Sequence, residues 1–243
     1  MMPASQLSAA LTTDTMQKTA ISWSGGKDCC LALIRARAAG LNVTTFLTMC
    51  EEDGLSKSHA LSPALIEAQV VRLGGEWVSV RVPAGRYGAA FAGALASLVA
   101  TGHTRMVFGD IDLQAHREWL EPACARAGLE AVFPLWGAAR RALSDEILER
   151  GLRACVVGVD TARLDADWCG VEYTRTFIRA LPPGVCPVGE GGEFHTFVFD
   201  APGMSSPVLF TRGERRLVAS APPLSPTRLA FQCLRLLDGQ KPA

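Results

Sequence analysis

The sequence of 243 residues lacks an excess of charge of either sign, because 24 Lys and Arg residues are matched by 24 Asp and Glu residues. A chain with zero net charge has no overall basic field that would attract nucleic acid. Long hydrophobic runs are also missing. The longest apolar stretch, residues 89–100, has twelve residues, whereas a helix that crosses a bilayer needs roughly 20. These absences argue against nucleic acid and membranes as partners.

The eight cysteines lack any regular spacing, and no two of them form a C-x-x-C pair. Several lie in apolar runs, as Cys155 does, where cysteine packs as a small hydrophobic residue. Only four histidines are present, so a zinc site has few ligands to draw on. Residues 1–17 contain no Lys or Arg and are rich in Ser, Thr and Ala, unlike an export signal. We therefore expect reduced thiols in a cytoplasmic protein with a disordered leader at residues 1–17.

What the sequence does contain is a glycine turn between a predicted strand and a predicted helix. The β-leaning run Thr19–Trp23 stops at the turn Ser24–Asp28, whose sequence is Ser-Gly-Gly-Lys-Asp, and a helical pattern follows. This arrangement presents backbone N–H groups and the positive end of the helix dipole to an anion. It predicts a phosphate site whose binding residues are Ser22, Ser24, Gly25, Gly26, Lys27, Asp28 and Cys29.

This turn is not a Walker A loop, whose pattern is G-x-x-x-x-G-K-[ST]. Ile21 stands at the position of the first glycine, and Asp28 replaces the Ser or Thr that holds magnesium. The carboxylate of Asp28 is itself a suitable Mg²⁺ ligand. We expect Lys27 to supply a mobile positive charge beside the phosphates. A plain glycine turn with an incidental lysine is the alternative interpretation.

Predicted strands and helices alternate along the first half of the chain, with strands expected at 19–23, 42–49, 77–82, 105–109 and 129–133. Such alternation predicts an α/β fold with a parallel five-stranded sheet and right-handed crossovers. Ligands of these sheets bind at the carboxyl ends of the strands, which adds Met49, Gly109 and Asp110 to the candidates for nucleotide binding. Asp110 is either a Mg²⁺ ligand together with Asp28 or the N-cap of the next helix.

The alternation ends near Gly137, and the second half of the chain has an α+β pattern. We expect helices at 139–149 and 172–180, a strand at 154–159, and a β pair formed by 195–200 and 208–211. The segment Leu229–Leu237 is amphipathic and has no assigned role. We therefore expect a first domain, a smaller second domain and a C-terminal extension, at residues 18–137, 138–218 and 219–243.

A second distinctive stretch, Gly189–Thr196, contains three glycines, two glutamates and a histidine. Titratable groups beside a flexible loop at the start of a strand fit substrate binding or acid–base chemistry. A solvated glycine hairpin would give a similar pattern. We expect Glu190, Glu193 and His195 to be catalytic and to share one cleft with the glycine turn. His59, in the loop after the second strand, is a candidate for the edge of the site.

Four motifs occur in a fixed order along the chain: Ser-Gly-Gly-Lys-Asp at 24–28, Phe-Gly-Asp-Ile at 108–111, Phe-Pro-Leu-Trp-Gly at 133–137 and Gly-Glu-x-Gly-Glu-Phe-His-Thr at 189–196. Together they resemble the diphthine–ammonia ligase family, a branch of the PP-loop ATP pyrophosphatases, which cleave ATP between its α- and β-phosphates. The resemblance implies ATP and Mg²⁺ as cofactors. It also implies that residues 18–137 form a Rossmann-like (HUP-type) ATP-binding domain and residues 138–218 a substrate domain. The reaction that it implies is the amidation of a substrate carboxylate with ammonia. In eukaryotic and archaeal members that carboxylate belongs to diphthine, a modified histidine.

The resemblance implies a reaction in two steps. The substrate carboxylate is first adenylated with release of pyrophosphate, and ammonia then displaces AMP. In this scheme the Ser24–Asp28 turn, with Lys27 as a catalytic residue and Mg²⁺, binds the pyrophosphate as its charge develops. Glu190, Glu193 and His195 face the acyl group or the ammonia.

Three residues depart from the family pattern. Cys29 replaces the Ser that ends the PP-loop, Gly191 stands where Asn is usual, and Val188 stands where Cys is common. Other functions therefore stay open. Bacterial relatives lack the diphthine target and some are linked to corrinoid (B12) salvage, and an Ala- and Arg-rich, Lys-poor composition is typical of a bacterial gene of high G+C content. A tRNA-modifying PP-loop adenylase and a non-catalytic adenine-nucleotide-binding protein are further alternatives, although the neutral charge argues against the first.

Overall fold

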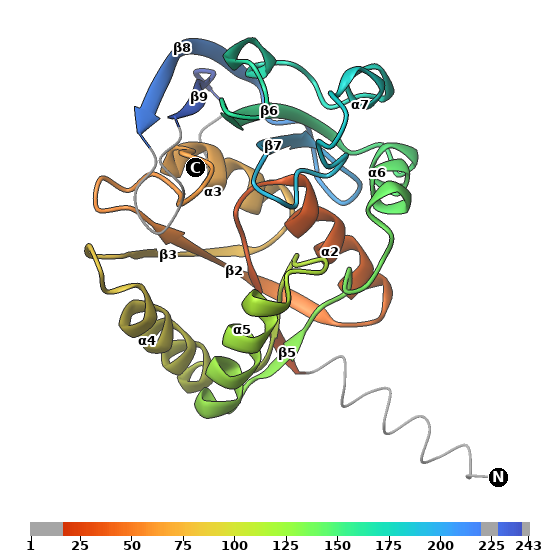
Figure 1. Ribbon diagram of the computed structural model, residues 1–243. Coiled ribbons are helices and arrows are strands. Elements are labelled where there is room, and N and C mark those ends of the chain that lie inside the picture. Colours follow the sequence, from red (N-terminus) through yellow and green to blue (C-terminus); the bar gives the residue numbers. More distant parts are fainter. Residues whose placement is uncertain (1–16, 220–227, 240–243) are drawn as a thin grey trace, which may run out of the picture.

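The computed structural model describes residues 17–219 and 228–239, in which two β-sheets pack against shared helices (Figure 1). The first sheet has five parallel strands in the order β3-β2-β1-β4-β5. They are β1 (Lys18–Ser22), β2 (Asn42–Cys50), β3 (Glu76–Arg81), β4 (His103–Val107) and β5 (Glu130–Val132). This confirms the expected Rossmann-like sheet and puts its topological switch point between the ends of β1 and β4. The leader expected at residues 1–17 lies outside the described residues, apart from Gln17.

Two pairs of helices cover the two faces of the parallel sheet (Figure 1). On one face lie α4 (Tyr87–Ala100) and α5 (Gln114–Ala127). A buried stripe at helical spacing holds α4 there, since it points Phe91, Leu95 and Leu98 to the same side. The other face is covered by α2 (Lys27–Ala38) and α3 (Pro63–Arg72), which also contact strands of the second sheet. The start of α2 therefore lies between the two sheets.

The second sheet is antiparallel, with the strand order β7-β6-β9-β8. Its strands are β6 (Arg153–Asp160), β7 (Phe194–Asp200), β8 (Phe210–Ala219) and β9 (Arg228–Leu236). The helical segments of this half of the chain are α6 (Arg140–Glu149), the 3-10 turn η1 (Ala166–Trp168) and α7 (Arg175–Ala180). This half has the α+β character that the sequence predicts.

The pairing within this sheet differs from the expected β pair. Strand β7 lies at one edge beside β6, and β8 lies at the other edge beside β9. The turn Ala201-Pro202-Gly203 led us to expect that residues 195–200 and 208–211 pair as neighbouring strands. That prediction was wrong, because β6 and β9 separate β7 from β8, although Val208 N donates to Phe199 O at 2.7 Å just before β8 begins. The amphipathic piece Leu229–Leu237 largely coincides with β9, whose alternate residues Ala230, Gln232 and Leu234 are buried, as the period of a strand requires. The segment assigned to a C-terminal extension thus includes an inner strand of the second sheet.

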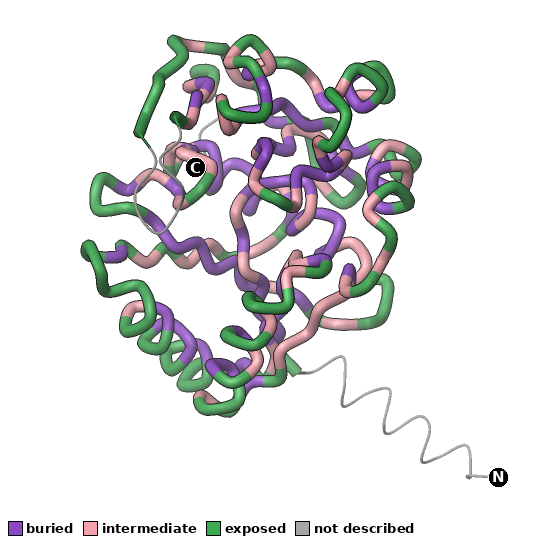
Figure 2. Tube along the Cα trace, viewed as in Figure 1, coloured by how far each residue is buried: buried purple, intermediate pink, exposed green. Residues whose placement is uncertain are grey.

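One hydrophobic cluster runs from the parallel sheet through α2 and α3 into the second sheet, and it includes Ile21, Leu31, Leu65, Val156 and Phe197. Figure 2 shows that buried residues occur in the central segments of both halves of the chain. A smaller cluster lies under α4 and α5. Because the larger cluster joins both halves of the chain, it fixes the start of α2 relative to β7.

Candidate functional site

A cavity of about 700 Å³ lies where the ends of β1 and β4 meet the start of β7. This volume lies within the range of small-molecule binding sites. Four segments line it, namely the turn before α2, the β2–α3 loop, the β4–α5 connection and the loop that leads into β7. The sequence candidates that line it are Ser22, Ser24, Lys27, Asp28, Cys29, His59, Gly109, Asp110, Glu190 and His195. The glycine turn and the glycine–glutamate stretch therefore share one cleft, as the sequence predicts.

The turn Ser24–Asp28 is held from two sides. Gly25 has a φ of +80°, a conformation that glycine adopts without penalty, and a Cβ there would lie 2.8 Å from Gln69 Oε1. The carbonyl of Gly25 accepts hydrogen bonds from Val198 N at 2.9 Å and from Gln69 Nε2 at 3.0 Å. Helix α2 begins at Lys27, so the positive end of its dipole lies at the cavity. This geometry suits an anion.

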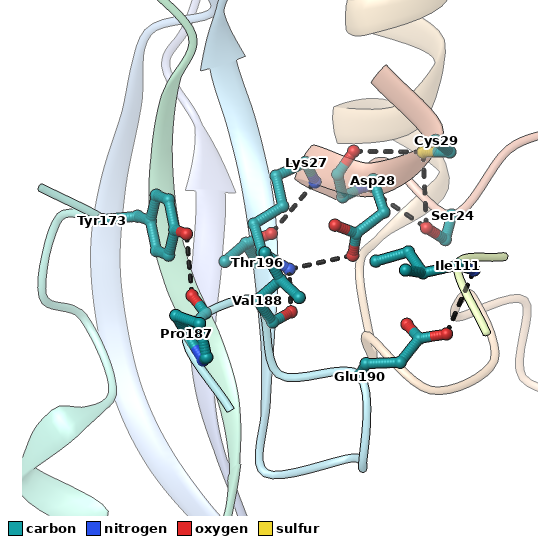
Figure 3. Close-up of polar contacts among 11 residues, drawn as sticks. Ser24, Lys27, Asp28, Cys29, Ile111, Tyr173, Pro187, Val188, Glu190 and Thr196 are labelled. Atoms are coloured by element: carbon teal, nitrogen blue, oxygen red, sulfur yellow. Dashed lines mark hydrogen bonds and ion pairs between the residues drawn. The ribbon is translucent and has the colours of Figure 1, made fainter. Parts of the chain in front are cut away.

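Lys27 is only 2% exposed, although its side chain reaches the cavity wall. Its Nζ donates to Asp28 Oδ2 at 2.8 Å and to the carbonyl of Val188, and its backbone N–H donates to Thr196 Oγ1 at 3.0 Å (Figure 3). The sequence predicts a mobile charge, and that prediction was wrong because these bonds fix the ammonium group between the two halves of the chain. An ammonium group has three N–H donors, so one remains for a ligand.

Three carboxylates, those of Asp28, Asp110 and Glu190, line the cavity from different segments. Burial raises the pKa of Asp28 and of Glu190, and the charge of Asp110 raises both further. Glu190 Oε1 accepts a hydrogen bond from Ile111 N at 3.1 Å (Figure 3). The buried Asp28 Oδ1 has no hydrogen-bond partner within the described residues. An unpaired carboxylate oxygen beside a second carboxylate suits a cation, although no cluster of three or more His, Cys, Asp or Glu suited to a metal occurs within residues 17–219 and 228–239.

The alternative role of Asp110 as a helix cap was wrong. Helix α5 begins at Gln114, its N-cap is Leu113, and no side chain caps it. Asp110 lies three residues before that cap, too early to reach the first turn in this way. Its Oδ1 instead contacts His116 Nδ1 at 2.9 Å. This hydrogen bond raises the pKa of His116, and it leaves Asp110 at the mouth of the cavity.

Gly109 brings the end of β4 against the first turn of α2. A Cβ on Gly109 would lie 2.8 Å from Cys29 N and 3.0 Å from the carbonyl carbon of Asp28. Cys29, which departs from the family pattern, donates its thiol hydrogen to Gly26 O at 3.1 Å, and its Sγ lies 3.4 Å from Ser24 Oγ. The thiol therefore occupies the place of a hydroxyl within the turn, where it is a weaker donor.

The β2–α3 loop places His59 against His195, with 4.7 Å between the ring centres. Gly26 makes room for this contact, because a Cβ there would lie 2.8 Å from His59 Nε2. Burial lowers the pKa of both histidines, to about 4 for His195, and the charge of Lys27 acts in the same direction. Both rings are therefore neutral near pH 7.

Four predicted site residues do not line the cavity, namely Gly25, Gly26, Met49 and Glu193. The side chain of Met49 packs into the hydrophobic cluster under α4 and α5, because alternate residues of a strand point to opposite faces. Glu193 is 2% exposed, and its Oε1 accepts from Cys186 N at 3.2 Å and pairs with Arg163 Nη1 at 3.2 Å. The structure thus places Glu193 beneath the loop, where it supports the loop and holds Arg163. Gly25 and Gly26 lie outside the cavity lining, and their lack of a side chain allows Gln69 and His59 to pack against the turn.

The cavity also has lining residues that the sequence did not single out, namely Ser58, Leu113, Asp160, Arg163 and Leu229. Asp160 is the last residue of β6. Arg163 is the one basic residue in the segment 160–167, which contains three aspartates. This isolated positive charge is the feature of the sequence that could have identified Arg163 as a site residue. Leu229 belongs to β9, and nothing local in the sequence indicates that this strand returns to the site.

The strand order and the helix N-terminus at the switch point define a Rossmann-like α/β protein with a second, antiparallel sheet. Two family models match the chain, the diphthamide synthase N-terminal domain over residues 17–131 and the diphthamide synthase C-terminal domain over residues 140–216. The chain therefore belongs to the diphthamide synthase family, which includes the diphthine–ammonia ligases.

The diphthine–ammonia ligase of Schizosaccharomyces pombe is 23% identical to the chain over 215 residues, which cover 79% of this chain and 36% of that relative. The chain thus spans about a third of the length of the curated relative that it matches. A solved structure described as a predicted subunit of a tRNA methyltransferase from Methanocaldococcus jannaschii is 15% identical, with a TM-score of 0.43 and coverage of 76% of this chain and 98% of that one. Among the described residues, no helix has the length and apolar character needed to cross a membrane.

Proposed function

We propose that the chain is an ATP-dependent ligase that adenylates a substrate carboxylate, releases pyrophosphate and transfers ammonia to the acyl group. The observation that carries this proposal is the shared cavity, in which the start of α2 faces Glu190 and His195. Membership of the diphthamide synthase family supports the same class of reaction.

The phosphate end of the cavity is the turn Ser24–Asp28. Glycines at the turn allow the backbone to approach an anion closely, and the dipole of α2 adds a partial positive charge. The buried ammonium of Lys27 stands beside this turn, already oriented by Asp28 and Val188. A charge that is fixed before the reaction stabilises a departing pyrophosphate without reorganisation.

Asp28 and Asp110 would hold Mg²⁺ beside the phosphates. The unpaired Oδ1 of Asp28 and the raised pKa of Asp28 next to Asp110 fit that role. Magnesium in nucleotide sites is commonly bound by one or two carboxylates together with substrate phosphates and water, which suits this pair. When bound, the ion would neutralise negative charge on the phosphates.

The acyl end of the cavity is formed by the second half of the chain. A carboxylate is a poor acyl donor because its leaving group would be oxide. When it attacks the α-phosphorus of ATP, the bond to the β-phosphate breaks, and the acyl group acquires AMP as a leaving group. Arg163, held by Glu193 at the far wall, offers further N–H donors to a substrate carboxylate. The carboxylate of diphthine, after which the Schizosaccharomyces pombe relative is named, is one substrate to test.

The experiment that tests this proposal is carboxylate-dependent exchange of labelled pyrophosphate into ATP in the absence of ammonia. Exchange requires reversible adenylation, and we expect it with Mg²⁺, ATP and the correct carboxylate from a panel of small-molecule and protein-borne acids. Asp28→Asn is isosteric, and we expect it to abolish exchange in a folded protein. ATP binding without exchange for any carboxylate would favour a non-catalytic nucleotide-binding protein instead.

A further inference from the structure

His59 sits on a strained stretch of backbone. Ser58 and Ala60 have φ values of 67° and 51°, and they are the two non-glycine residues with positive φ within the described ranges. Non-glycine residues in this region persist where the surrounding structure over-determines them, and they cluster at ligand sites. Here Ser56 clamps the loop, because its Oγ accepts from Leu61 N at 3.1 Å and its carbonyl from Ala60 N at 3.0 Å. The loop therefore holds His59 in one fixed position.

That position turns the ring of His59 toward His195, at 4.7 Å between ring centres, and both side chains line the cavity. The buried Nδ1 of His59 has no hydrogen-bond partner of good geometry within the described residues, and the backbone of Lys57 nearby raises the pKa of the ring only in part against burial. A buried ring nitrogen without a well-placed partner is costly. The arrangement points to a ligand that supplies the missing hydrogen bond.

The charged groups around the two rings indicate which charge a ligand at this position carries. Lys27 faces both rings from α2, and Asp28, Asp110 and Glu190 line the same cavity from the other segments. Burial and Lys27 together lower the pKa of each ring, so this position disfavours added positive charge. Neutral imidazole has an acceptor nitrogen. The best fit is therefore a small, neutral N–H donor rather than a cation.

We infer that His59 and His195 together bind the neutral ammonia that attacks the activated carboxylate. This inference rests on the function proposed above and adds the position of the nitrogen nucleophile. In the transfer step the nitrogen forms a bond to the acyl carbon, and the bond between that carbon and the AMP oxygen breaks with its electron pair. The nitrogen loses one proton, which solvent accepts, while the two neutral rings hold the nitrogen in place.

The test is a titration of the full-length protein, labelled with ¹⁵N in its histidine rings, with ammonium chloride. The chain has four histidines, so each ring can be followed separately in long-range ¹H–¹⁵N spectra. We expect the ring nitrogens of His59 and His195 to shift. His103 is the internal control, because its ring nitrogens are already bonded to Thr45 Oγ1 and Leu98 O. Potassium chloride at equal ionic strength should leave all four rings unchanged.

The pH dependence separates ammonia from ammonium. Below the pKa of ammonium, the concentration of free ammonia rises about tenfold per pH unit. Neither His59 nor His195 titrates between pH 7 and pH 8, since both pKa values are lowered. We expect the half-saturating total concentration of ammonium chloride to fall about tenfold between these pH values. An unchanged half-saturating concentration, a shift that potassium reproduces, or no shift of these two rings would overturn the inference.

Variants of His59 separate binding from packing. His59→Phe keeps a ring of similar size but has no acceptor, and we expect it to raise the half-saturating concentration seen at His195 by roughly two- to tenfold, the worth of one neutral hydrogen bond. His59→Gln keeps an acceptor and should restore most of the affinity. If His59→Phe does not fold, His195→Phe with detection at His59 gives the same comparison. Equal affinities for the Phe and Gln variants would contradict the inference.

The two proposals fail in different ways. If no carboxylate supports pyrophosphate exchange, the ligase function fails whatever the histidine spectra show. If exchange occurs but ammonia leaves both rings unchanged, the ligase function stands and only the ammonia site is wrong.

Discussion

Gly109→Ala tests whether the end of β4 really presses on the start of α2. The substitution adds one carbon atom, which would lie 2.8 Å from Cys29 N and 3.0 Å from two further backbone atoms. Gly109 is not among the glycines with positive φ, so alanine fits its backbone conformation and the effect is purely steric. All three atoms that the new Cβ would meet belong to the backbone of α2, so no flexible side chain can move away to relieve the contact. Either β4 or the first turn of α2 must shift by about 0.6 Å to restore an ordinary contact.

The size of the effect follows from that shift. Overpacking against rigid neighbours costs about 1–3 kcal/mol in the free energy of unfolding, and a chain of this size loses about 2–4 °C of Tm per kcal/mol. Hydrogen bonds from N–H to oxygen span about 2.7–3.2 Å. If the turn binds a phosphate of ATP as proposed, a shift of this size breaks one of its hydrogen bonds to that phosphate. Losing one bond to a charged group costs about 1.5–3 kcal/mol. We therefore expect the Kd for ATP to rise roughly ten- to hundredfold.

Calorimetric titration with ATP and thermal unfolding measure the two effects. Gly93→Ala is the matched control, since Gly93 lies within α4 and a Cβ there meets no atom within 4 Å. We expect it to raise the free energy of unfolding by about 0.5–1 kcal/mol and to leave ATP affinity unchanged. A Gly109→Ala protein that is as stable as the parent and binds ATP equally well would refute the close approach.

Three further predictions concern the turn, its support and the histidine pair. Cys29→Ser replaces a weak donor with a hydroxyl beside Ser24, and steady-state pyrophosphate release should rise about two- to tenfold; a fall would show that the thiol is needed. Gln69→Ala removes the amide that donates to Gly25 O and accepts from Trp23 Nε1. Urea unfolding should then show a loss of about 2–5 kcal/mol, because buried groups stay unpaired, and a loss under 1 kcal/mol would contradict this. Since the pKa of His195 falls from 6.5 to about 4 on folding, the unfolded chain binds more protons between these values. The free energy of unfolding therefore decreases as the pH falls from about 6.5 to about 4. His195→Gln should show a smaller decrease over the same range, and identical pH profiles for the variant and the parent would refute the lowered pKa.

The sequence predicts the parallel sheet well because its signals are local. Each strand of that sheet is followed by a glycine, a helix pattern or both, and parallel strands with crossover helices have few alternative arrangements. The glycine turn Ser24–Asp28 and the start of β7 carry distinctive residues, and the structure brings both to one cavity. The rule that ligands bind at the carboxyl ends of strands places Gly109 and Asp110 there without any structural information.

The second sheet was harder because its pairing is not local. The turn at 201–203 favours a hairpin, but strand β9, far along the chain, inserts beside β6 instead. The direction of individual side chains was equally out of reach. Glu193 and His195 are two residues apart on one motif, yet one is buried beneath the loop and the other lines the cavity. Lys27 could not be recognised as buried, because its partner Val188 O lies 161 residues away.

The identity of the bond that breaks in ATP tests the central claim most directly. In the proposed function, the turn Ser24–Asp28 with Lys27 binds the two terminal phosphates, and the α-phosphorus stays open to the substrate carboxylate. Phosphorus NMR of a reaction with Mg²⁺, ATP, ammonium chloride and a carboxylate that supports pyrophosphate exchange identifies the products. We predict AMP and pyrophosphate in equal amounts. The appearance of ADP and phosphate would contradict the claim, because a cradle for pyrophosphate does not explain cleavage between the β- and γ-phosphates.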